Sequence, residues 1–132
     1  MTTSPGPKSK FNNLTQADSK FAMHIPEMSE REILEKLGYG EAIKKGGIPA
    51  AEAEFRQNHN NAEPTPEKLR AVLTQAVYDK ETFLGMGATN ITVGQAYSIT
   101  TAANRTGVPA QDIAKLAIAE RAFDHTFRSN RM

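Results

Sequence analysis

The chain has 132 residues, with 16 Lys and Arg against 15 Asp and Glu, so its formal net charge is +1. This length suits one small domain. The absence of Cys excludes a disulfide-stapled fold, a Cys-ligated metal site and a thiol nucleophile. The apolar stretches are much shorter than the roughly 20 residues that span a bilayer, so no membrane contact is expected.

The charge is distributed unevenly along the chain. Residues 1–20 carry a net charge of +2, residues 21–87 carry −3 and residues 88–132 carry +2. An acidic middle between basic ends fits termini that meet a negatively charged partner. A bias of this size also fits an ordinary solvated surface.

The first 28 residues are rich in Ser, Thr, Asn, Gln, Pro, Gly and Lys. Because the few apolar side chains bury too little surface to offset the entropy of ordering, the composition predicts a flexible polar arm. Phe11, Phe21 and Ile25 are isolated apolar residues in this arm. They are candidate anchors for docking on a protein partner.

Short helices are predicted over residues 29–57. Ser29 and Glu32 have capping-box spacing, which predicts a helix from about residue 30 to 37 that ends at Gly38. The glycine-rich stretch that follows predicts a loop. Pro49 opens a second short helix, and residues 58–65, which include His59, form an Asn/Pro linker.

The strongest helical pattern covers residues 66–130. Thr65 caps a helix that should reach Leu84, and its apolar face suits an internal core or a homodimer interface. Thr92 opens the next helix with a second capping box, and Pro109 begins the last one. No useful apolar–polar alternation occurs, so the expected fold is an all-α small helical bundle with a disordered amino-terminal arm.

One segment, ITTAANRTGVPAQDIAKLA at residues 99–117, has a spacing that carries information about function. It resembles the helix-turn-helix motif of bacterial and phage DNA-binding domains. In that motif two helices are held together by a small residue, a turn glycine and three apolar residues that pack between the helices. The matching positions are Ala103, Gly107, Val108, Ile113 and Leu116.

The resemblance implies that the last helix is the recognition helix, with its early positions facing DNA bases. Gln111 then reads adenine, and Lys115 contacts guanine or a phosphate. Backbone phosphates would be contacted by Arg105, Arg121, Arg128 and Arg131. A plain helical hairpin requires the same turn glycine and the same apolar residues between its helices, so both interpretations stay open.

No pattern of catalytic residues is found in the sequence. His24, His59 and His125 are far apart, without metal-ligand spacing. Tyr39, Tyr78 and Tyr97 are scattered, so they form no aromatic platform for single strands. A non-enzymatic protein without metal or other cofactor is therefore expected.

Two functions fit these patterns. The first is a DNA-binding regulatory or accessory protein of bacterial, phage or plasmid type that uses the helix-turn-helix on duplex DNA. The second is a protein-interaction module, such as a virion component or a secreted bacterial effector, that binds no nucleic acid. We expect a cytoplasmic location, with secretion independent of a signal peptide or packaging in a virion as alternatives.

Overall fold

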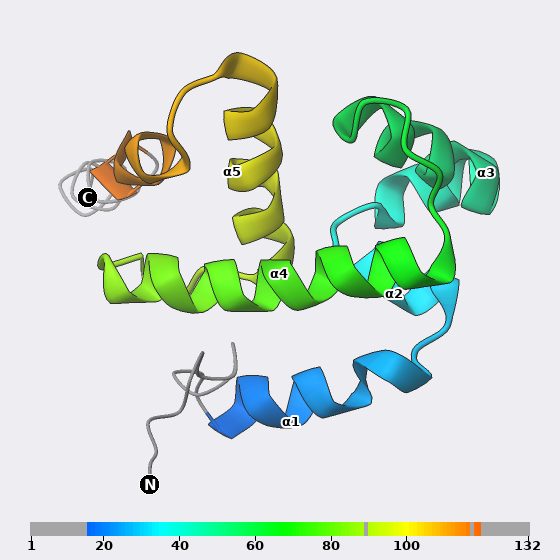
Figure 1. Ribbon diagram of the computed structural model, residues 1–132, viewed down its shortest axis with the longest axis horizontal. Helices are drawn as coiled ribbons and strands as arrows, with labels where there is room; N and C mark the ends of the chain where they lie inside the picture. Colours follow the sequence, from blue (N-terminus) through cyan, green and yellow to red (C-terminus); the bar gives the residue numbers. More distant parts are fainter. Residues whose placement is uncertain (1–15, 89, 117, 120–132) are drawn as a thin grey trace, which may run out of the picture.

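The structure is a computed structural model, in which residues 16–88, 90–116 and 118–119 are described (Figure 1). These described residues form helices joined by short connections, and they include no strand. The fold is all-α, as predicted. The elements are α1 (Gln16–His24), the 3-10 helix η1 (Ile25–Glu27), α2 (Glu30–Lys36), α3 (Gly40–Asn58), α4 (Pro66–Gly85) and α5 (Val93–Thr106). Residues 110–116 and 118–119 are also helical and are called the C-terminal segment.

Helix α4 is the centre of the arrangement and contacts α5, α2, α1 and η1. In Figure 1, α1 lies along one side of α4, and α5 leaves the opposite side at a steep angle. The apolar positions of α4 recur at three- and four-residue spacing, which places them on one side of the helix. The buried ones are Leu69, Leu73, Ala76, Val77 and Phe83.

The predicted helix starts are confirmed by side-chain hydrogen bonds. The Ser29 hydroxyl accepts a bond from the Glu32 backbone N–H, and the Glu32 carboxylate accepts one from the Ser29 N–H. Thr92 and Gln95 make the same reciprocal pair at the start of α5. Thr65 accepts a bond from the first turn of α4. Each cap satisfies backbone donors that have no partner within the helix.

The amino-terminal region differs from the predicted arm. Residues 16–27 are helical, and Ile25 is 2% exposed within the core. Phe21 is half-buried, packs against the same core and lies 5.5 Å below the Lys36 ammonium group. These two proposed docking residues are therefore held by the protein's own fold. The arm prediction is corrected for residues 16–28, whereas Phe11 lies outside the described residues.

The predicted loop after α2 is also corrected. Residues 40–46 are helical, and the helix is interrupted at Gly47, whose φ of 77° and ψ of −173° are not helical. The second part, residues 48–58, has Pro49 in its first turn, as expected. Ala42 and Ile43 are buried beside Tyr39, and this burial outweighs the cost of glycine in a helix.

The buried side chains form two clusters along α4. The first cluster joins α1, α2, α3 and the amino-terminal half of α4, with Tyr97 contributed by α5. The second cluster joins the end of α4 to the α4–α5 connection, α5 and the C-terminal segment. Its buried members are Phe83, Ala88, Ile91, Ala96 and Ala114. The C-terminal segment is thus held mainly by small and aliphatic side chains.

A pair of carboxyl groups lies where α2 meets α3. A hydrogen bond with Glu52, burial and the charge of Glu52 raise the pKa of Glu30 from 4.5 to about 7. Because the folded protein holds this proton more tightly than the unfolded chain, the resulting stability is present below pH 4.5. It is lost as the pH rises through about 7.

We expect Glu30→Gln to reduce the loss of stability between about pH 5 and about pH 8, because glutamine carries no titrating charge. Urea unfolding of both proteins at the two pH values measures the effect. Glu67→Gln, an exposed substitution in α4, is the charge-matched control and should keep the wild-type slope. Identical slopes for all three proteins would contradict the assignment to Glu30.

Candidate functional site

The turn between α5 and the C-terminal segment has the backbone geometry that the sequence predicted. Gly107 follows α5 with a φ of 79°, and its N–H donates to the Ala103 carbonyl oxygen. A residue with a Cβ adopts this left-handed conformation only at a cost. The glycine therefore ends α5 and lets the chain turn into the next helical stretch.

The packing after the turn differs from the helix-turn-helix expectation. Val108 is 41% exposed and Leu116 is 65% exposed, although both were predicted to fill the angle between the helices. Ile113 is half-buried. The face that packs inward instead contains Ala110, Ala114 and Ile118. The C-terminal segment is therefore rotated about its own axis relative to the helix-turn-helix expectation. Residues four apart share a face of a helix, and the small alanine side chains let this face pack closely.

Three of the six predicted DNA-contacting residues are described by the structure, and all three are exposed. Gln111 and Lys115 are exposed and lie one helical turn apart on the C-terminal segment. Arg105 is exposed at the end of α5. The remaining predicted phosphate contacts, Arg121, Arg128 and Arg131, lie outside the described residues.

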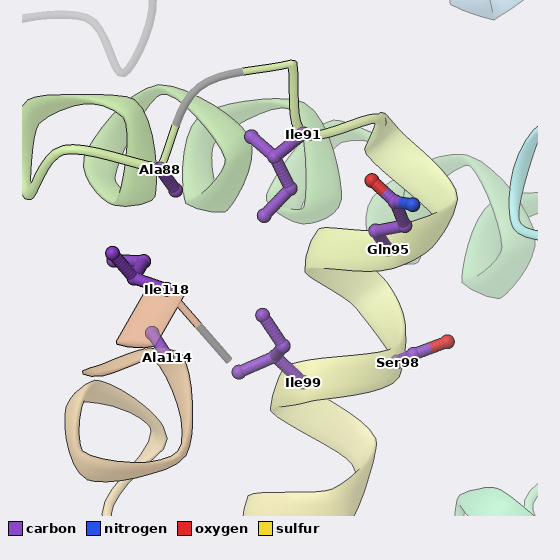
Figure 2. Close-up of a pocket in the computed structure, with 7 residues that line it drawn as sticks. All are labelled: Ala88, Ile91, Gln95, Ser98, Ile99, Ala114 and Ile118. Carbon is purple, nitrogen blue, oxygen red and sulfur yellow. The ribbon is translucent and has the colours of Figure 1, made fainter. Parts of the chain in front are cut away.

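An apolar hollow of about 230 Å³ lies between α5, the α4–α5 connection and the C-terminal segment. In Figure 2, Ile91, Ile99 and Ile118 converge on this space from the three elements, and the Ser98 hydroxyl points away from it. The lining residues are Ala88, Ile91, Gln95, Ser98, Ile99, Ala114 and Ile118. We call this space the apolar hollow.

The apolar hollow exists because small side chains hold the C-terminal segment in place. Ala114 is 1% exposed and lies among the buried residues of the second cluster. Its methyl group fills little space, and in Figure 2 the side chains of Ile99 and Ile118 lie on different sides of the apolar hollow. A largely apolar concavity with a few polar groups at its edge is the usual form of a binding site.

A second group of side chains forms a hydrogen-bonded cluster between α3 and α5. The hydroxyl groups of Tyr39 and Tyr97 bond to each other, although 58 residues separate them in sequence. The Asn58 amide donates to the Tyr39 hydroxyl at 2.9 Å, and His59 Nε2 lies 2.7 Å from the Tyr97 hydroxyl. The His59 ring stacks on Phe55 with centroids 4.1 Å apart.

This tyrosine cluster is poorly solvated, and the acid–base properties of its members follow from that. Burial raises the pKa of the Tyr39 and Tyr97 hydroxyl groups, so both stay protonated. Burial, and then the positive charge of Lys68, lower the pKa of His59. The cluster is therefore uncharged near neutral pH. Its hydrogen bonds connect α3 to α5.

The tyrosine cluster has no local signature in the sequence. In the sequence, Tyr39 and Tyr97 are far apart, and His59 falls in the predicted Asn/Pro linker. No local spacing connects residues so far apart in the chain. The available signal was Tyr97, which lies within the helix that the Thr92 capping box predicts.

Within the described part of the chain, no His, Cys, Asp or Glu residues gather in threes to hold a metal. No described helix is long and apolar enough to cross a membrane. No protein-family model matches the chain, and neither the curated proteins nor the solved structures provide a significant match.

Proposed function

We propose that the chain is a non-enzymatic protein-interaction module whose apolar hollow receives one apolar side chain of a partner protein. The observation that carries this proposal is the hollow itself, with a volume of about 230 Å³. An apolar cavity of about 150 Å³ in another protein is large enough for a benzene ring. The apolar hollow therefore has room for one Leu, Met or Phe side chain.

The occupant that fits the surroundings is an amphipathic helix of the partner. The apolar hollow lies between two helices, and its lining is mostly aliphatic. Helix recognition commonly places one or two apolar side chains of the ligand in such a groove. Gln95 is exposed at the edge, where its side-chain NH₂ group can donate to polar groups beside the anchor.

DNA binding is the alternative, and the exposure of Gln111 and Lys115 on one face favours it. Against it, Val108 and Leu116 face solvent. They are two of the three apolar residues that the motif requires between its helices. Labelled duplex DNA titrated at about 50 and about 200 mM salt tests this alternative, because phosphate-mediated affinity falls by orders of magnitude across that range. The interaction proposal predicts no saturable binding at the lower salt concentration.

The interaction proposal is tested with a display library of amphipathic helical peptides of about 15 residues, a length that allows helix formation. The library is selected on the full chain, and enriched peptides are titrated against defined variants. Ala114→Leu adds volume inside the apolar hollow and should weaken binding at least about tenfold, which corresponds to 1.4 kcal/mol. Ile99→Ala removes part of the lining and should also weaken binding.

Leu116→Ala is the matched control. It lies on the same helical segment but is 65% exposed and does not line the apolar hollow, so it should leave peptide affinity unchanged. Loss of affinity in Leu116→Ala with full affinity in Ala114→Leu would contradict the proposed site. Sedimentation velocity of the full chain alone identifies a second copy as the occupant if a dimer forms and Ala114→Leu abolishes it.

A further inference from the structure

A polar hollow lies at the other end of α5, next to the tyrosine cluster. It has a volume of about 540 Å³ and is formed where the end of α3, the following connection, the first turn of α4 and the last turn of α5 meet. The lining residues are Asn58, His59, Asn60, Lys68, Asn104 and Arg105. We call this space the polar hollow.

The charged residues that line the polar hollow have one sign. Lys68 and Arg105 are the charged residues of its lining, and no carboxylate is among the lining residues. Within the described part of the chain, neither cation forms an ion pair. Among the described residues, Lys68 and Arg105 therefore line a space to which no carboxylate contributes.

Two neutral side chains that line the polar hollow, Asn58 and His59, are held in place by contacts with the tyrosine cluster. The Asn58 amide bonds to Tyr39, and the His59 ring is fixed by its contact with Tyr97 and its stacking on Phe55. Groups held by a second layer of contacts lose less entropy when a ligand binds. Asn60, just after α3, has a positive φ of 54°, a conformation that Asn readily adopts at helix ends.

We propose that the polar hollow is a binding site for the phosphate group of a small phosphorylated molecule, with Lys68 and Arg105 as the two charged ligands. A phosphate monoester carries a charge of about −1.5 to −2 at neutral pH, which matches the two cations better than a carboxylate does. Arg and Lys are both common phosphate ligands, and the Asn60 and Asn104 amides can donate further hydrogen bonds. The volume exceeds the needs of phosphate alone and falls in the range for small-molecule sites.

The test uses the full chain with inorganic phosphate, adenosine monophosphate and acetate at equal ionic strength. We expect saturable binding of both phosphates and none of acetate, measured by calorimetry and by NMR shifts of the residue 58–60 and 104–105 amides. Tighter binding of the nucleotide identifies an ester as the natural ligand, whereas equal affinity identifies free phosphate. Both results support the site.

Lys68→Gln and Arg105→Gln should each weaken phosphate binding at least about tenfold, because each removes a charge-assisted contact. Lys45→Gln removes the same charge from an exposed position on α3 and should leave affinity unchanged. The proposal is overturned if the phosphates do not bind, if acetate binds equally well, or if Lys45→Gln weakens binding as much as the other two. Binding of duplex DNA without binding of either small phosphate would also overturn it.

Discussion

Phe55→Ala is expected to lower the free energy of unfolding by about 3–5 kcal/mol, the range for removing a buried Phe side chain. Phe55 is 0% exposed in the first cluster. Its ring lies edge-on to Tyr39, with centroids 6.5 Å apart, and stacks on His59. Alanine leaves a cavity between them. A domain of this size is stable by about 5–15 kcal/mol, so the loss is a large share of the total stability.

Urea unfolding followed by far-UV circular dichroism measures this loss. Phe55→Leu keeps an apolar side chain of similar volume and should cost less than about 1.5 kcal/mol. A small and equal effect of both substitutions would show that Phe55 is not part of a packed core. The comparison therefore distinguishes the cost of a cavity from the cost of any substitution at this position of α3.

Tyr97→Phe is expected to cost about 1–3 kcal/mol although it removes a single oxygen atom. The Tyr97 hydroxyl bonds to both Tyr39 and His59. Tyr97 is 4% exposed, so water cannot easily replace the lost partner. A buried polar group left without a hydrogen bond carries its full cost of desolvation.

Tyr78→Phe is the matched control for this prediction. Tyr78 is only half-buried on α4 and does not line the tyrosine cluster, so the loss of its hydroxyl should cost less than about 0.5 kcal/mol. Chemical denaturation of both variants in the same buffer gives the comparison. Equal stabilities of the two variants would remove the tyrosine cluster as a source of stability.

The local features of the fold follow from the sequence. A hydroxyl residue three positions before Glu or Gln predicts a helix start, and Ser29 and Thr92 both make the expected bonds. Gly107 adopts the predicted left-handed conformation. These features depend on residues within one helical turn, so their chemistry is visible in a short window of sequence.

Features that depend on distant residues were not predictable in this way. The helix that begins at Gly40 is stabilised by the burial of Ala42 and Ile43, and average composition in that stretch favours a loop. The same limit applies to the amino-terminal residues, where Ile25 is buried against other helices. Tertiary burial outweighs local propensity in both places.

The candidate sites depend on how helices rotate about their own axes. The spacing of Val108, Ile113 and Leu116 suits a helix-turn-helix, but Ala110, Ala114 and Ile118 also share one face of the same segment. Sequence periodicity does not decide which of two apolar faces packs inward. The structure buries the face with the alanines, and the apolar hollow beside Ala114 is a consequence.

The most direct test of the proposed interaction is a methyl NMR titration of the full chain with a peptide selected from the helical library. The account predicts shifts that concentrate on the methyl groups lining the apolar hollow, those of Ala88, Ile91, Ile99, Ala114 and Ile118. The methyl groups of Leu116 and Val108, which are exposed elsewhere, should change little. Shifts confined to Leu116 and Val108, with the apolar hollow unaffected, would contradict the account.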